Sequence, residues 1–149
     1  MKFHIIVAMV AVIGALAAVA IVSGASHPKA TGGVGWFAAG LDRSASFNAH
    51  GTVPAKGQFN YHDEAGNFIK ATVVCYNQTG DDDAVFTSEV SDTNLAVYAA
   101  AGFVKTTVHD GGTPGRNGDT IRNVAVTTDD CSTPTAGGFA VDNGNLVVH

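Results

Sequence analysis

Two groups of aspartates have the chemistry of a calcium site. Asp81, Asp82 and Asp83 are consecutive. Asp110 and Asp119 lie at the two ends of a glycine-rich stretch. Carboxylate oxygens are ligands that Ca²⁺ prefers, but a calcium loop places them at alternating positions and ends on a bidentate glutamate. Because that spacing is missing, we expect a solvated acidic turn and predict no metal ion or other cofactor, with calcium as the open alternative.

Two histidines that stand beside carboxylates raise the question of acid–base catalysis. His62 precedes Asp63 and Glu64, and His109 precedes an aspartate in the same way. Proton transfer needs groups within hydrogen-bond reach, and neighbours in sequence point to opposite faces of a strand. No serine lies in a Gly-x-Ser-x-Gly motif, and no two histidines have the His-x-x-x-His spacing of a zinc hydrolase. The sequence therefore predicts no catalytic and no cofactor-binding residue.

The glycine-rich stretch at 108–120 (VHDGGTPGRNGDT) has the composition of a phosphate-binding loop. Such a loop opens a helix and, in a P-loop, carries a lysine. No lysine follows here, and the next segment, TIRNVAVT, is rich in the β-branched residues of a strand. We expect the stretch to be a turn between two strands, in which Gly115 takes a positive φ after Pro114.

Aromatic residues and a glycosylation motif suggest contacts with sugars. A stacking platform could be built from Trp36, Phe37, Tyr61 and Tyr76. Aromatic residues on strands more often fill the core, however, and core is the interpretation we favour. The motif at 77–79 (NQT) matches a glycosylation acceptor and is most simply interpreted as an exposed loop.

The first 25 residues differ from the rest of the chain. Lys2 precedes an uncharged run at 5–22, and Ser23, Gly24 and Ala25 supply the small residues of an export cleavage site. This pattern predicts a secretory signal peptide over 1–25, in the form of a hydrophobic helix. A retained membrane helix stays open as the alternative, because the run has the minimum length that crosses a bilayer.

Composition favours a single all-β domain after that segment. The chain has 149 residues, of which only 14% are charged, and it contains 18 glycines, so turns should be numerous. A net charge of -5 argues against a nucleic-acid partner, which would call for a basic surface. After a short linker at 26–33, segments of strand-forming residues alternate with turn residues. The expected strands are 34–39, 44–49, 56–62, 68–76, 84–90, 95–108, 120–127, 139–141 and 145–149.

These strands predict an antiparallel β-sandwich or barrel of eight or nine strands over 34–149. The segments 56–62 and 68–76 should form a hairpin around a turn at 63–67. The segment 95–108 is ambiguous, because its first residues are alanine-rich and favour a helix while its end is rich in strand formers. We predict a strand there, with helix as the alternative for its start.

Cys75 and Cys131 are the only cysteines. In an oxidising compartment such a pair favours a disulfide. It would close a loop of on the order of 50 residues and stabilise the fold by roughly 4 kcal/mol in the chain-entropy description. Two buried reduced cysteines remain the alternative. The wide spacing argues against a redox Cys-x-x-Cys motif and against a structural zinc site.

Several short motifs follow one another in the order seen in a known family. They are TGGVGWF at 31–37, KGQFNY at 56–61, Cys75 at a strand end, DGGTPG at 110–115 followed by Asp119, Cys131, and NGNLVVH at 143–149. Over 31–149 the chain resembles the bacterial post-COAP domain family. The resemblance implies a compact all-β module of exported or surface proteins in which the cysteine pair recurs. It implies no catalytic residue.

Together these observations predict a secreted or cell-surface β-domain without catalytic activity, a binding or structural module of the bacterial envelope. The expected partner is an envelope glycan or an extracellular protein. Once the N-terminal segment is removed, we expect no contact with a membrane. Two alternatives stay open. One is a small secreted hydrolase that places His62 or His109 beside a carboxylate only in three dimensions. The other is an inhibitor of a secreted enzyme.

Overall fold

The computed structural model describes residues 26–112 and 118–149. Its elements are β1 (Lys29–Ala38), β2 (Leu41–His50), β3 (Lys56–Asp63), β4 (Phe68–Gln78), β5 (Asp83–Thr93), α1 (Ala96–Ala101), β6 (Phe103–His109), β7 (Thr120–Val126), β8 (Phe139–Ala140) and β9 (Asn143–Val148). The expected signal peptide and the conformation of Gly115 lie outside the described residues. β1 begins inside the segment expected to be a linker, because its first residues already pair with β2 and β9. No helix within the described ranges has the length and apolar character needed to cross a bilayer.

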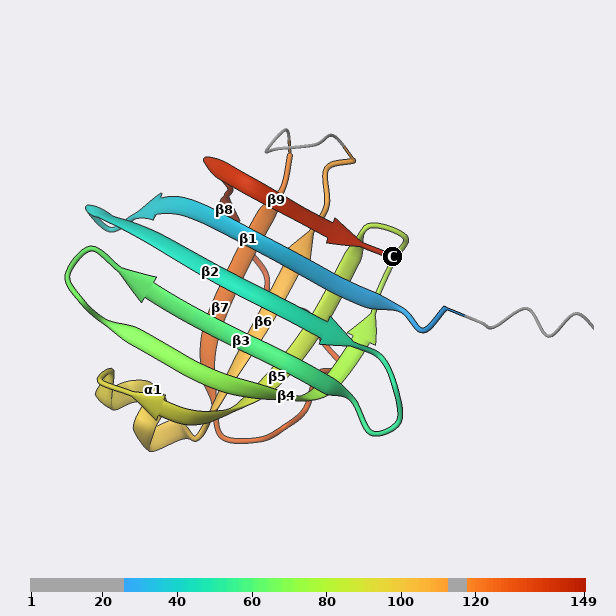
Figure 1. Ribbon diagram of the computed structural model, residues 1–149, viewed down its shortest axis with the longest axis horizontal. Helices are drawn as coiled ribbons and strands as arrows, with labels where there is room; N and C mark the ends of the chain where they lie inside the picture. The colour runs from blue at the N-terminus through green and yellow to red at the C-terminus, as the bar shows by residue number, and fades with distance from the viewer. Residues whose placement is uncertain (1–25, 113–117) are drawn as a thin grey trace, which may run out of the picture.

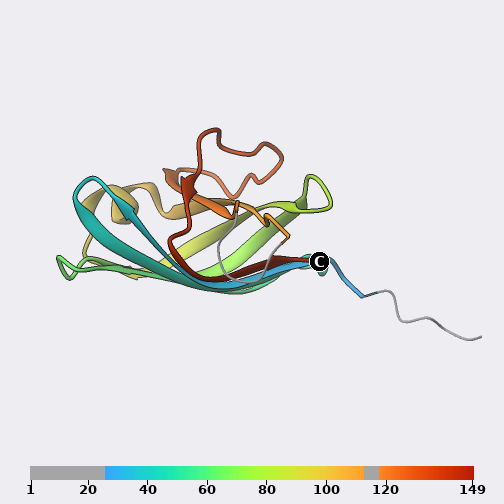
Figure 2. The same cartoon turned by 90° about the horizontal axis from the view of Figure 1, so that it is seen from above.

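The strands form one antiparallel sheet in the order β8-β7-β6-β5-β4-β3-β2-β1-β9. β1 to β7 follow one another as a meander, and the sheet curls until its two halves face each other (Figures 1 and 2). Only Val141 and Asp142 separate the two edge strands, β8 and β9, along the chain. The N–H of Val141 donates to the Asp119 oxygen at 3.0 Å, and that of Asp142 to the Gly35 oxygen at 2.8 Å. This two-residue link therefore bridges both edges of the curled sheet.

The all-β prediction is confirmed, and the architecture is a curled half-barrel. Strand twist accumulates across a wide sheet and makes it coil, so the nine strands enclose their own core. Within residues 26–112 and 118–149 no second sheet forms, so the sandwich alternative is wrong. The hairpin expected around 63–67 is confirmed as β3 and β4. The stretch after His109 connects β6 to β7, as the sequence predicts.

Alternation of side chains along the strands builds the core on the concave face. In β3, Phe59 is buried while Gln58 and Asn60 on either side of it are exposed. Phe86 of β5 has no exposed surface, and its ring centroid lies 5.3 Å from that of Phe47 and 6.2 Å from that of Phe59. Because β2 and β5 are not neighbours in the sheet, the contact between Phe47 and Phe86 crosses the interior and joins the two halves.

Helix α1 replaces the first part of the strand expected at 95–108. Alanine is the strongest helix former, and no residue of α1 is buried, so strand pairing gives this segment no competing stabilisation. The helix ends at Gly102, whose φ of 84° is the left-handed cap conformation and whose N–H donates to the Tyr98 oxygen at 2.9 Å. The prediction of a strand over 96–101 is therefore wrong, while β6 follows as expected.

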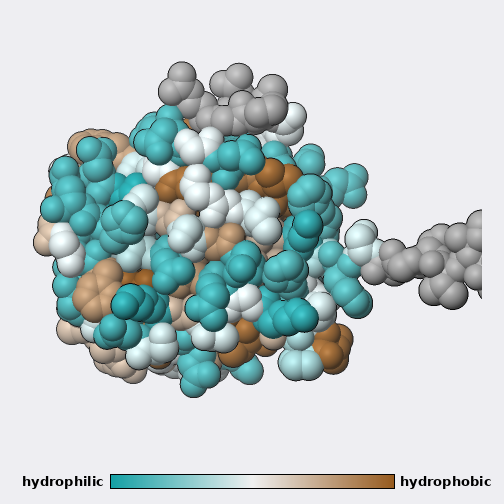
Figure 3. Space-filling view, viewed as in Figure 1, coloured by the Kyte–Doolittle hydropathy of each residue, from teal (hydrophilic) through white to brown (hydrophobic). Residues whose placement is uncertain are grey.

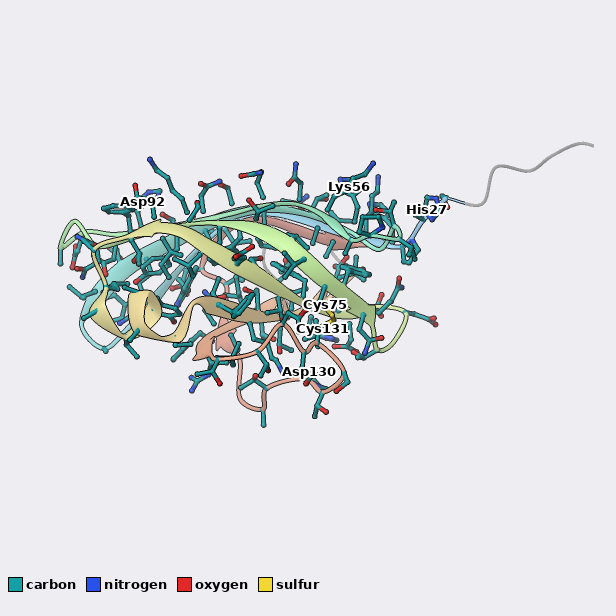
Figure 4. All side chains as sticks on the ribbon, turned by 90° about the horizontal axis from the view of Figure 1, so that it is seen from below. His27, Lys56, Cys75, Asp92, Asp130 and Cys131 are labelled. Atoms are coloured by element: carbon teal, nitrogen blue, oxygen red, sulfur yellow. A yellow bond between two sulfur atoms is a disulfide. The ribbon has the colours of Figure 1, made fainter. Side chains whose placement is uncertain are left out.

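A disulfide joins Cys75 of β4 to Cys131, so the alternative of two reduced cysteines is wrong. Cys131 belongs to the segment 127–138, between β7 and β8, which lies against the outer face of the sheet (Figure 4). Cys75 pairs across the sheet with Thr87, and the Thr87 hydroxyl donates to the Asp130 oxygen at 2.9 Å. An irregular segment thus covers the part of the outer face that a second sheet would cover in a sandwich.

Asn77 of the glycosylation motif lies in β4 and not in the exposed loop expected. Its side chain is half-buried, and Nδ2 donates to the backbone oxygens of Cys131 and Ser132, each at 3.3 Å. A glycan on this nitrogen would displace the segment that the disulfide holds. The motif therefore does not mark an accessible acceptor in the folded chain.

We expect Gly144→Ala to detach β9 partly and to lower the free energy of unfolding by about 1–3 kcal/mol. Gly144 has a φ of 98°, and an added Cβ would collide with the backbone oxygen of Gly33 on β1. Urea denaturation measures the effect. Gly40→Ala is the matched control, since Gly40 has a φ of 79° but nothing within 4 Å of an added Cβ. Equal losses in the two variants would show that the collision contributes nothing.

Candidate ligand cavity

A partly enclosed cavity of about 200 Å³ lies inside the curl. Four aromatic side chains line it, namely Trp36, Tyr61, Tyr98 and Phe139. They come from β1, β3, α1 and β8, and the Trp36 and Tyr61 rings lie 6.0 Å apart. Figure 2 shows how the curl and α1 bring these distant elements to the same end of the molecule. The walls therefore include aromatic side chains from both halves of the sheet.

The carboxylate of Asp63, which also lines this cavity, is 8% exposed and accepts three hydrogen bonds. Asn67 donates its backbone N–H to Oδ1 at 3.0 Å and its Nδ2 to Oδ2 at 2.9 Å. The Tyr61 hydroxyl donates to Oδ2 at 3.1 Å. Burial acts to raise the pKa of Asp63, but these hydrogen bonds outweigh it and hold the pKa below its ordinary value. Burial, followed by the bond to Asp63, raises the pKa of Tyr61 to about 12.

Three residues that line the cavity each carry a buried N–H donor with no partner. The donor atoms are Trp36 Nε1, Arg43 Nε and Asn123 Nδ2. Trp36 is 3% exposed, so its indole is removed from bulk water. The buried Thr106 hydroxyl donates to Asn123 Oδ1 at 3.0 Å and leaves the amide nitrogen as the unused end. Buried polar groups are nearly always hydrogen-bonded, so three such donors around one cavity indicate a site for a hydrogen-bond acceptor.

Two arginines lie near this cavity, and one of them, Arg43, is opposite the lining carboxylate Asp63 in the register of β2 and β3. Arg43 lines the cavity, and the Arg122 guanidinium lies 5.2 Å from the centroid of the Phe139 ring. Burial raises the pKa of Tyr98, while the charges of Arg43 and Arg122 act to lower it. None of the ion pairs within the described ranges includes Arg43.

We expect Asp63→Asn to lower the free energy of unfolding at neutral pH by about 1–3 kcal/mol, because buried donors lose a charged acceptor. The pKa of Asp63 is lower in the folded state than in the unfolded state. The ionised carboxylate therefore stabilises the fold fully at pH values above the unfolded pKa of about 3.9, and this contribution is lost as the pH falls through the folded pKa. Urea denaturation between pH 7 and pH 2 should therefore show a flatter acid dependence in the variant. Asp129→Asn, at an exposed position, should keep the wild-type dependence, and an unchanged slope in Asp63→Asn would contradict the assignment.

A shallower outer groove of about 420 Å³ opens at the ends of β1 to β3 and shares Trp36, Arg43 and Asp63 with the cavity. There Ser44 of β2 pairs with His62 of β3, and Ser44 Oγ lies 2.8 Å from His62 Nε2. Glu64 and Asp142 also line the groove. His62 points to the outer face and Asp63 to the concave face. The hydrogen-bond partner of His62 is therefore on the neighbouring strand and is not the next residue in the sequence. Figure 3 shows that this outer face of β1 to β4 is mainly hydrophilic with scattered hydrophobic residues.

His109, the second histidine considered for catalysis, is hydrogen-bonded to an aspartate at the surface. Its Nδ1 lies 2.8 Å from Asp83 Oδ1, and the two side chains are 45% and 47% exposed. The partner is thus an aspartate on the adjacent strand β5 and not Asp110, which follows His109 in the sequence. This pair links the end of β6 to the start of β5.

Among the remaining calcium candidates, the carboxylates of Asp110 and Asp119 accept backbone N–H groups. Asp81 and Asp82 are exposed in the turn between β4 and β5. Asp110 Oδ2 accepts the N–H of Val148 at 3.1 Å and so ties the end of β6 to β9. Asp119 is 1% exposed and accepts a backbone N–H of the same loop at 2.8 Å. Among residues 26–112 and 118–149, no three side chains of histidine, cysteine, aspartate or glutamate gather as a metal-binding group.

The four aromatic residues considered for sugar stacking do not share a surface. Trp36 and Tyr61 line the interior cavity, Tyr76 packs against the core, and Phe37 is 60% exposed. Sequence reasoning missed Arg43 and Asn123 as site residues. The only signal for each is an inward place in the alternation of its strand, Arg43 in β2 and Asn123 in β7. The cavity that defines them forms only when the sheet curls.

No protein-family model, no curated protein and no solved structure matches this chain.

Proposed function

We propose that this protein is a non-catalytic, secreted or cell-surface β-domain that binds a small ligand in its interior cavity. The observation that carries the proposal is the set of buried, unpartnered donors on Trp36, Arg43 and Asn123. Leaving a buried donor unsatisfied costs about 1–3 kcal/mol. A ligand that supplies acceptor atoms removes this cost, so it binds the folded protein favourably.

Two features support an exported location for this binding module. Disulfides persist in oxidising compartments, and the chain contains the bond between Cys75 and Cys131. The uncharged run at 5–22 and the small residues that end at Ala25 have the pattern of an export signal. The resemblance to the post-COAP domain family points in the same direction. An envelope glycan or an extracellular protein is then the partner class that would present the bound group.

The test uses protein purified after expression of the full sequence and labelled with ¹⁵N. Trp36 is the only tryptophan, so its indole N–H gives a single side-chain resonance that reports on one of the three donors. We expect members of a library of small ring compounds to shift this resonance, and Asn123→Leu to weaken their binding. Ser44→Ala, in the outer groove, is the control that should bind them unchanged. A library in which no compound shifts the Trp36 resonance would refute the cavity as a ligand site.

A small hydrolase is the second candidate function, and the contact between Ser44 and His62 is the observation that favours it. A hydroxyl within hydrogen-bond reach of an imidazole can act as a nucleophile activated by a general base. The two functions differ in the expected effect of Ser44→Ala on the hydrolysis of activated esters. A binding module should hydrolyse p-nitrophenyl acetate at the same slow rate in both forms, whereas loss of turnover in Ser44→Ala would favour the hydrolase.

A further inference from the structure

We propose that the interior cavity binds a monocyclic aromatic carboxylate, with its ring between the aromatic walls and its carboxylate against Arg43, Trp36 and Asn123. This inference rests on the proposed function and names the ligand class of the same cavity. It follows from the balance of donors and acceptors, from the charge and from the size of the site.

The buried polar atoms that line the cavity without a partner are all donors. The Asp63 carboxylate already accepts from Asn67 and from the Tyr61 hydroxyl. Asn123 Oδ1 already accepts from the Thr106 hydroxyl. A ligand whose main polar group is a donor would therefore compete with existing bonds. A group with several acceptor lone pairs matches what the cavity leaves unused, and a carboxylate is such a group.

The Arg43 guanidinium, whose Nε has no partner, favours a charged acceptor over a neutral one. Asp63 is the acidic side chain among the lining residues; it lies opposite Arg43 in the register of β2 and β3, and three neutral donors hold its carboxylate. Arg43 contributes a guanidinium that enters none of the ion pairs found in the described part of the chain. Arg122 adds a second positive charge behind Phe139. Arginine binds carboxylates with charge-assisted hydrogen bonds that are about twice as strong as neutral ones.

The size and walls of the cavity select a single ring. A volume of about 200 Å³ exceeds the cavity of about 150 Å³ that holds benzene in a protein interior. The additional volume is of the order of that of one small polar substituent on the ring. Trp36, Tyr61, Tyr98 and Phe139 supply aromatic faces and edges, which pack well against a further ring. A long acyl chain or a disaccharide would exceed this space.

Titration calorimetry with matched probes tests the inference on protein expressed from the full sequence. Benzoate is the probe, benzamide and benzyl alcohol keep the ring but not the charge, and acetate keeps the charge but not the ring. We expect benzoate to bind at least about tenfold more tightly than each of the other three, and to shift the Trp36 indole resonance. Arg43→Gln should lower the affinity for benzoate by at least about tenfold and leave the affinity for benzyl alcohol unchanged. Lys56→Gln, at an exposed position outside the cavity, is the control variant and should leave benzoate binding unchanged.

The outcomes separate this inference from the proposed function. If the neutral ring compounds shift the Trp36 resonance and bind as tightly as benzoate, the cavity is a ligand site but the carboxylate assignment is wrong. Should acetate bind as tightly as benzoate, the ring is not recognised and the assignment fails in that part. If no probe and no library compound shifts the resonance, the proposed function fails as well. The comparison among the four probes is made on the wild-type protein, so it remains decisive even if Arg43→Gln does not fold.

Discussion

Phe86→Ala is expected to lower the free energy of unfolding by about 3–5 kcal/mol, the usual cost of removing a buried aromatic ring. Phe86 has no exposed surface and contacts the rings of Phe47 and Phe59. Its contact with Phe47 joins strands that are not hydrogen-bonded to each other, so the variant leaves a void between the two halves of the sheet. Natural domains are stable by only about 5–15 kcal/mol, and the variant should therefore unfold at a much lower urea concentration.

The control for Phe86→Ala is Val97→Ala. Val97 is an apolar residue of α1 that is 60% exposed, so its truncation should change the free energy of unfolding by no more than about 0.5 kcal/mol. Both variants are compared with the wild type by urea denaturation at neutral pH. A Phe86→Ala midpoint as close to wild type as that of Val97→Ala would mean that the interior contact between the two halves carries little of the stability.

Removal of the disulfide, by Cys75→Ser together with Cys131→Ser, is expected to cost about 4 kcal/mol. The bond spans a sequence separation of 56 residues, and without it the unfolded chain regains the conformational freedom of that loop. In the folded state the loss is felt most by the segment 127–138, which the bond holds against β4 and β5. Denaturation of the double variant measures the effect.

A reducing agent supplies the matched control for the disulfide. It should lower the denaturation midpoint of the wild-type protein to that of the double variant, and it should leave the double variant unchanged, because these are the only cysteines. If the wild-type midpoint is the same with and without the reducing agent, the bond contributes nothing to stability and the argument for an oxidising compartment loses its support.

Local patterns in the sequence were enough to predict most of the strands. In the hairpin of β3 and β4, alternation of apolar and polar residues on both sides of a short glycine-containing turn identifies the two strands and their connection. The turn after His109 is likewise identified by glycine and proline followed by β-branched residues. The pairing of Cys75 with Cys131 needed only the count of cysteines and the expectation of export. The strands and turns depend on residues near one another in sequence, and the disulfide had only one possible pairing.

The segment at 96–101 shows where local patterns were insufficient. Its alanines are compatible with both a helix and a buried strand, and the decision depended on whether a neighbouring strand was available to pair with it. In the folded chain β5 pairs with β6 from Phe103 onward, and α1 stays exposed at the end of the sheet. Intrinsic helix propensity therefore prevailed.

The all-β class, the hairpins and turns, and the disulfide could be predicted from the sequence, because each follows from short-range periodicity or from the single available partner. The curl of the sheet into a half-barrel, which brings together Trp36, Arg43 and Asn123, is a property of the folded chain alone. These residues lie on β1, β2 and β7, and no spacing in the sequence relates them. The physical reason is that the cavity depends on the sum of many small strand twists, which sets the distance between the two halves, whereas each strand depends only on its own alternation.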